Sequence, residues 1–182
     1  MNRKMPVAIA LGVIITMAAI SFSAYSGTAV SEGLKVTGWV KVEVVRDGTI
    51  IYTHDGHNLI TNAGKDFIAH RIGSTDTVGA NGANYIALTT TAITPAATDT
   101  TLSGEITTNG LARAQGTYSH TNGTNTYTIT KQFTASGTFT GVQGAGLFTA
   151  SSSGTMMSEN TFSSVNLISG DQITITWTIT IS

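Results

Sequence analysis

The residues best suited to metal chemistry lie in the run His54-Asp55-Gly56-His57. Two histidines flanking Asp55 could hold Zn²⁺ or Ni²⁺ if Asp55 or a partner chain supplied further ligands, because imidazole and carboxylate groups suit such ions. The same run is typical of a polar turn that follows a hairpin, and we favour this interpretation. We therefore predict no metal site, with His54, Asp55 and His57 as the only candidate ligands.

The sequence contains no pattern of a catalytic or cofactor site. Its acidic residues are scattered singly, and no motif sets two carboxylates across a glycosidic bond. There is no Gly-x-Ser-x-Gly elbow and no phosphate-binding loop. The absence of cysteine excludes disulfides, thiolate metal sites and a cysteine nucleophile. We predict a non-enzymatic protein that uses no cofactor.

One modification motif is present. Asn122-Gly123-Thr124 is an N-glycosylation sequon, which makes Asn122 a candidate glycosylation site on a surface hairpin. The densest group of glycines favours bulges and tight turns over a ligand-binding loop. This group consists of Gly137, Gly141, Gly144 and Gly146.

The composition indicates a polar but weakly charged surface. Charged residues make up 10% of the 182 residues, against roughly 25% in an ordinary soluble domain. Threonine suits the solvent-facing side of a strand, because its β-branched side chain fits a pleated surface and its hydroxyl tolerates water. Without Arg3 and Lys4 the chain has seven basic and ten acidic residues and no basic run. We therefore expect no nucleic-acid partner.

The N-terminal residues 1–26 form a segment of their own. Arg3 and Lys4 precede an uncharged stretch at residues 5–25, and about 20 apolar residues can span a bilayer as a helix. The segment is either a signal peptide, cut after Ser26 or Ala29, or an uncleaved membrane anchor. Both alternatives predict an extracytoplasmic protein. A pilin-like helical stem is a third use, although no typical processing site precedes the apolar stretch.

After a linker or arm at residues 27–35, the period of the hydrophobic pattern changes to two, which indicates strands in a domain at 36–182. Residues 36–45 and 49–53 predict a hairpin around Arg46-Asp47-Gly48. The clearest strand pattern lies at residues 173–181, where isoleucines and Trp177 alternate with threonines. Further strands are expected at 85–90, 111–119, 126–134, 137–142, 145–150 and 154–162.

A single helix is predicted within this domain, at residues 63–72. Asn62 is expected to cap its N-terminus, and Gly73 to end it. Of Met156 and Met157, one is expected to lie in the core and the other to face out. Eight or nine strands and one short helix indicate an all-β, antiparallel β-sandwich or jelly-roll-like domain, preceded by the N-terminal hydrophobic helix.

The order of segments in residues 36–181 resembles a β-rich virion structural domain of tail-associated and fibre-like proteins of phages and archaeal viruses. This resemblance implies an oligomeric module for assembly or host contact. The chain differs from soluble tail components by its N-terminal apolar segment, which favours an exported cell-surface protein or a membrane-associated virion protein. The resemblance lies in HNLITNAGKDFIAHRIG (57–73), NYIALTTTAITPAATDTTLSGEI (84–106), GAGLFTASSSGTMMSENTF (144–162) and SGDQITITWTITIS (169–182).

We therefore expect a structural subunit of an extracellular or virion surface assembly, which forms a homo-oligomer or joins other structural subunits. In this hypothesis, residues 27–35 with the following strand act as a donor arm for the sheet of a neighbour. The alternative is a receptor-binding or carbohydrate-binding module. Its sugar-stacking residues would be Tyr85, Tyr118 or Tyr127.

Overall fold

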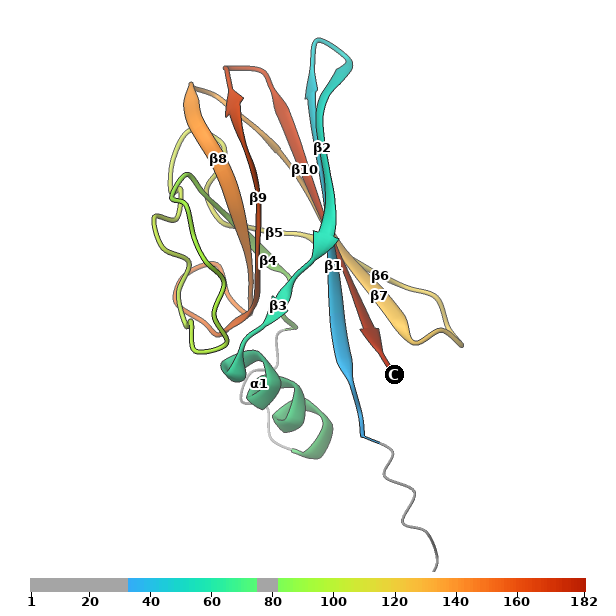
Figure 1. Cartoon of the computed structure of the whole chain (residues 1–182). Coiled ribbons are helices and arrows are strands. Elements are labelled where there is room, and N and C mark those ends of the chain that lie inside the picture. Colours follow the sequence, from blue (N-terminus) through green and yellow to red (C-terminus); the bar gives the residue numbers. More distant parts are fainter. Residues whose placement is uncertain (1–32, 75–81) are drawn as a thin grey trace, which may run out of the picture. The chain divides into compact units, whose positions relative to one another are not determined.

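A computed structural model describes residues 33–74 and 82–182 of the chain, and Gly33–Ser182 form one compact unit (Figure 1). The predicted signal peptide or anchor at 1–26, and the arm up to residue 32, lie outside the described residues. The elements are β1 (Val36–Arg46), β2 (Thr49–His57), β3 (Leu59–Ile60), α1 (Asn62–Gly73), β4 (Tyr85–Thr89), β5 (Ala114–Gln115), β6 (Thr117–His120), β7 (Thr126–Thr134), β8 (Phe139–Phe148), β9 (Met156–Leu167) and β10 (Gln172–Ile181).

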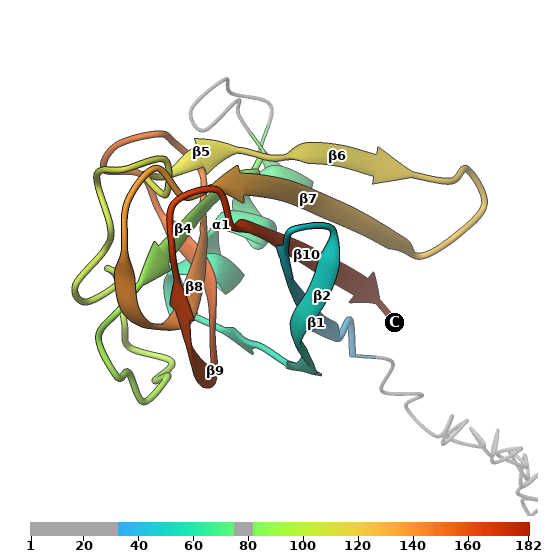
Figure 2. The ribbon, with the colours of Figure 1, turned by 90° about the horizontal axis from the view of Figure 1, so that it is seen from above.

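The strands form two antiparallel sheets of five strands each. The strand order is β2-β1-β10-β7-β6 in sheet A and β3-β9-β8-β4-β5 in sheet B. Figure 2 shows β4, β8 and β9 on one side of the domain, with the long strands of sheet A beside them. One hydrophobic core draws its side chains from both sheets. The predicted all-β domain of two antiparallel sheets with one short helix is confirmed for the described residues, whereas the predicted N-terminal hydrophobic helix lies outside them.

The core depends on strands β1 and β10, which pair along their length with matching alternation. Val40 lies opposite Trp177, and Val42 lies opposite Ile175. All four side chains are fully buried, whereas the threonines between them face outward, as a period of two requires. The alternation predicted that Ile181, at the end of β10, is buried with the other isoleucines, but Ile181 is 36% exposed.

Sheet B is covered on both faces. Its inner face packs into the main core, while the loop between β4 and β5 brings Leu102 against Phe148 and Met156 on the other face. Met156 and Met157 are therefore both buried, at 0% and 1% exposure. The prediction that one of them faces out was wrong, because it assumed a sheet with one solvated face.

Helix α1 begins at Asn62, the residue that was predicted to be its N-cap. Thr61 is the N-cap, and its Oγ1 accepts a hydrogen bond from the Gly64 N–H at 2.9 Å. The same hydroxyl donates to the Met156 carbonyl oxygen at 2.6 Å. Because this second bond fixes buried Thr61 against β9, Thr61 replaces Asn62 as the cap. Gly73 is the last helical residue, and Ser74 follows as the C-cap with an extended backbone.

Several strand boundaries also differ from expectation. Strand β2 continues to His57, so the histidine pair lies in a strand and not in a turn. The predicted strand at 111–119 divides into β5 in sheet B and β6 in sheet A. Gly116, at the division, is buried so tightly that an added Cβ would lie 2.8 Å from Ile129 Cγ2.

In the glycine-rich part of the chain, two predicted strands are instead joined into one. The predicted strands at 137–142 and 145–150 form the single strand β8, which is paired irregularly with β9. The register shifts twice between Phe139 and Gly144, and Gly141 has a φ of 75° within this stretch. Strand β9 runs to Leu167, five residues beyond the predicted end.

The two turns at one end of sheet A are joined by an ion pair. Asp47 and Gly48 have φ values of 50° and 77°, as expected for the predicted two-residue hairpin turn. Arg46, before this turn, donates from Nε and Nη2 to the two carboxylate oxygens of Asp171, at 2.8 and 2.6 Å. Asp171 lies in the β9–β10 turn, where it is 1% exposed. The Arg46 guanidinium lowers the pKa of Asp171 below its usual value.

We expect Asp171→Ala to destabilise the domain by about 2 kcal/mol, because buried hydrogen bonds between charged groups are lost. Since the pKa of Asp171 is lowered on folding, its contribution is complete above its unfolded pKa. It disappears as the pH falls through the folded pKa. Urea unfolding at pH 7 and at pH 3 measures both effects. Asp66→Ala, at an exposed position of helix α1, is the matched control, and equal losses in the two variants would contradict the assignment.

Candidate functional site

The three candidate metal ligands do not lie on one side of the sheet. Asp55 and His57 pair with Lys41 and Trp39 on the outer face of sheet A, the face turned away from sheet B. His54 pairs with Val42, whose side chain is fully buried. No group of three His, Cys, Asp or Glu side chains among residues 33–74 and 82–182 could hold a metal ion. Strand alternation thus separates residues that are close in sequence.

His54 instead belongs to the border of the core. Its ring lies 5.9 Å from the Phe162 ring, at an angle of 40°. The Nε2 atom is enclosed and makes no hydrogen bond. Burial lowers the pKa of His54, so the neutral ring is favoured, as suits an apolar contact.

Asp55 and His57 surround Trp39 on the outer face. The Trp39 indole N–H donates to Asp55 Oδ1, and the His57 ring meets the indole edge-on, with centroids 4.2 Å apart. Trp39 remains 37% exposed. Tyr85, Tyr118 and Tyr127 were predicted from the sequence as exposed aromatic residues, and Trp39 was not. The alternation of residues 36–44 places Trp39 on the same side of the strand as Lys41, and this pattern could have identified Trp39 as exposed.

On strands β6, β7 and β10 the outer face consists mainly of hydroxyl groups. Register places Thr130 beside Thr176, and Thr128 beside Thr178. Thr130 Oγ1 donates to Thr176 Oγ1 at 3.2 Å. Such a face can approach another surface without strong charge repulsion. The hydroxyl array comprises Thr117, Ser119, Thr126, Thr128, Thr130, Thr174, Thr176, Thr178 and Thr180.

Sheet A ends in two strands that no further strand of the described residues covers. These are β2 and β6. The first half of β2 carries no charge, and Ile50 and Ile51 are 54% and 44% exposed. Every residue of β6 is exposed. Uncovered edges usually carry charges, prolines or bulges that prevent pairing; here Asp55 and the bulge at Val44/Val45 protect part of β2.

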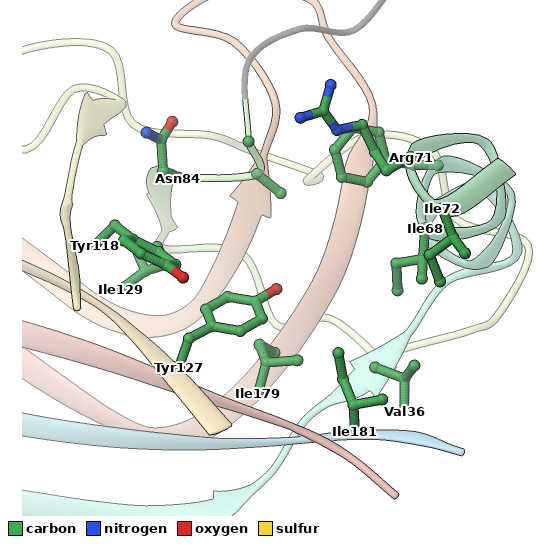
Figure 3. A pocket seen from close by; sticks show the side chains of 13 residues that line it. Val36, Ile68, Arg71, Ile72, Asn84, Tyr118, Tyr127, Ile129, Ile179 and Ile181 are labelled. Atoms are coloured by element: carbon green, nitrogen blue, oxygen red, sulfur yellow. The ribbon is translucent and has the colours of Figure 1, made fainter. Parts of the chain in front are cut away.

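An apolar pocket of about 400 Å³ lies between α1 and the inner face of sheet A. Figure 3 shows Ile68 and Ile72 of the helix on one side, with Tyr127, Ile179 and Ile181 on the other. A second pocket of about 410 Å³ adjoins the first, sharing Val36, Ile68 and Ile72 and adding Leu34, Lys35, Lys65 and Ala69. We call the two pockets together the basal groove.

The two tyrosines of the groove differ in exposure. Their ring centroids are 5.6 Å apart. Tyr118 is 57% exposed, whereas burial raises the pKa of Tyr127 to about 12. Tyr85, the third predicted sugar-stacking residue, is partly buried and packs against the cluster that covers sheet B. Tyr118 is therefore the one of the three with a ring open to a ligand.

Two carboxyl groups that are distant in sequence meet beside sheet B. The Ala96 N–H donates to Glu159 Oε1 and to Asp99 Oδ2, both at 3.0 Å. Glu159 is 2% exposed. Burial and a hydrogen bond to Asp99 raise the pKa of Glu159 to about 7. The pair holds the β4–β5 loop against β9, and nothing in the sequence indicated it.

Asn122 lies in the exposed turn between β6 and β7. The next residue, Gly123, has a φ of 85°, which explains the glycine. The side chain is therefore accessible to a glycosylating enzyme, and its modification stays a prediction.

The acid pair predicts a specific dependence of stability on pH. Between about pH 4.5 and pH 7 the unfolded chain ionises at Glu159 while the folded protein keeps the proton. Stability should therefore fall as the pH rises through this window, by at most about 1.4 kcal/mol per pH unit from this group. Glu159→Gln should remove that fall.

Urea unfolding from pH 4 to pH 8 measures the effect. Glu43→Gln, a carboxylate on the outer face, is the matched control and should keep the wild-type pH dependence. An unchanged pH profile in Glu159→Gln would show that Glu159 is ionised in the folded protein.

Comparison with known proteins supplies no further guide to the site. The chain matches no protein-family model, no curated protein and no solved structure. No helix in residues 33–74 and 82–182 has the length and apolar character needed to cross a bilayer. The function is therefore inferred from the geometry of the domain.

Proposed function

We propose that this protein is a non-enzymatic structural subunit of an extracellular or virion surface assembly, such as a fibre, a filament or a tail-like structure. Its copies would associate by edge pairing of β-strands. The observation that supports this most directly is the pair of uncovered edges of sheet A, β2 and β6. An uncovered edge presents N–H and C=O groups in the spacing that another strand requires.

The donor arm in this proposal is shorter than the sequence suggested. Strand β1 is paired with β2 on one side and with β10 on the other, so it is not available to a neighbour. Lys35 also exchanges two backbone hydrogen bonds with Ser182, at 2.6 and 2.8 Å. An arm that joins the edge of another copy would thus consist of residues 27–34.

The proposal places the domain outside the cytoplasm. Residues 5–25 would act as a hydrophobic helix, either in a cleaved signal peptide or as a membrane anchor. The hydroxyl array of sheet A suits lateral packing of weakly charged subunits. The resemblance to virion structural domains agrees with this role, and a cell-surface assembly would use the same contacts.

Edge pairing predicts that charge on the two edge strands prevents assembly. Thr53→Lys and Ser119→Lys together should decrease assembly of the full chain at least about tenfold. A lysine on an exposed edge strand hinders pairing with a further strand, and lysines on both edges would repel each other where β2 of one copy meets β6 of the next. Electron microscopy and sedimentation of the full chain measure the effect. Thr176→Lys and Thr178→Lys together, which add the same charge to central strand β10, are the matched control. An equal loss in the control would point to face-to-face packing instead.

The alternative function, a receptor-binding or carbohydrate-binding module, is favoured by Trp39. Its exposed ring is oriented by Asp55 and His57, and sugars stack on such rings while carboxylates accept hydrogen bonds from their hydroxyl groups. This alternative predicts that the full chain binds immobilised glycans and that Trp39→Ala abolishes binding. Tyr85→Phe is the control. Absence of binding across a glycan array, with assembly intact, would exclude the alternative.

A further inference from the structure

Exposed apolar side chains gather at the two opposite ends of sheet A. At one end, Ile50 and Ile51 beside the β1–β2 turn are joined by Ile168, which is 46% exposed. At the other end, the basal groove is bordered by Leu34 and Ile72, at 65% and 67% exposure. Figure 1 shows the β1–β2 hairpin projecting at one end of the domain and α1 lying at the other.

The projecting end is held together as one unit. Arg46 forms an ion pair with Asp171, and Asp171 Oδ2 accepts the Ile168 N–H at 2.8 Å. The β1–β2 turn and the β9–β10 turn are therefore fixed to each other. We call this end, with Asp47, Ile50, Ile51 and Ile168, the apical tip.

The groove exists because the inner face of sheet A continues past the part that sheet B covers. Val36 pairs with Ile181 in this extension, and both residues line the pocket. Helix α1 covers the extension incompletely, since Gly64 is its only fully buried residue. A protruding apolar side chain would bury the exposed surfaces of Ile68 and Ile72, which the hydrophobic effect favours.

The charges at the two ends are complementary. Lys35 and Lys65 border the groove and are exposed. The apical tip presents Asp47 at its apex, also exposed, while the charge of Arg46 is matched by Asp171. An acidic apex entering a groove with basic borders gains Coulomb energy and selects one orientation of docking.

The tip cannot reach the groove of its own chain. Both are attached to the same strand, since β1 runs from Val36 in the groove to Arg46 at the tip. Eleven residues of strand place the two ends about 33 Å apart. Only the tip of a second copy can meet this groove.

We propose that the apical tip of one copy docks into the basal groove of the next, so that copies join end to end along β1. The two surfaces of this contact differ, so it can repeat into a ring or an open row of subunits. The proposal rests on the assembly function above and adds a second contact to it, with a second copy of this chain as the occupant of the groove.

The absence of cysteine from the chain makes a direct test possible. The variant Ile51→Cys, Ile72→Cys carries one thiol at the tip and another in the groove. Mild oxidation of the full chain, in membranes or in detergent, should give a ladder of covalent multimers on a denaturing gel. Each single variant should give no ladder. The variant Gln132→Cys, Ile72→Cys, with an exposed thiol on the outer face, is the matched control and should also give none.

Charge reversal tests the orientation of docking. In the double-cysteine chain, Asp47→Lys should decrease the multimer yield about tenfold, and adding Lys65→Asp should restore it, because the ion pair forms again with its charges exchanged. A ladder that ignores both changes, or that forms equally in the Gln132→Cys control, would reflect random collisions and would overturn the proposal.

The same variants separate this proposal from edge pairing. A ladder that persists when Thr53→Lys and Ser119→Lys abolish lateral assembly supports end-to-end docking as a separate contact. If chains with unmodified edge strands give a ladder but no lateral assembly, end-to-end docking is supported and edge pairing is contradicted. Filaments without a ladder overturn docking. If the thiol introduced by Ile72→Cys is protected from a maleimide reagent and no ladder forms, docking is also overturned, since the groove then holds another occupant.

Discussion

The inner face of sheet A is a continuous apolar strip, because β1 and β10 alternate in phase along their whole pairing. Val40, Val42 and Val44 are set opposite Trp177, Ile175 and Ile173, and all six are fully buried. At about 25 cal/mol per Å² of apolar area, burial of this strip stabilises the domain. A one-residue slip would turn the threonines inward, so the register is fixed by the same burial.

The unequal covering of the two sheets follows from this packing. Sheet B lies against the middle of the strip and is covered on its other face by the β4–β5 loop, which the Glu159–Asp99 pair retains. Sheet A keeps a solvated outer face, two uncovered edge strands and an inner face that extends past sheet B. Contacts with other molecules are therefore expected mainly at sheet A, where backbone groups and apolar side chains remain available.

The few charged groups of the chain fix positions that hydrophobic burial leaves free. The Arg46–Asp171 pair joins two turns, and Arg113 pairs with Glu105 while stacking 3.5 Å above the Phe148 ring. The first pair links segments 125 residues apart, and Arg113 holds the loop that contains Glu105 against β8 through Phe148. On the outer face, Lys41 pairs with Glu43, and strands β6, β7 and β10 present mainly hydroxyl groups. A surface of this kind resists neither lateral nor end-to-end association by charge repulsion.

Local patterns determined much of this protein. The alternation at 173–181, the Asp47-Gly48 turn and the helix near 63–72 were readable from sequence, because each depends on neighbours within a few residues. The Thr61 cap depends on β9, and the burial of both methionines depends on the covering loop. The division of 111–119 depends on β4, which pairs with β5 while β6 pairs with β7. Packing between distant segments also brought Glu159 to Asp99, whereas strand alternation separated His54 from Asp55 and His57. Sequence spacing describes one strand, whereas the groove and the acid pair arise only where separate elements pack.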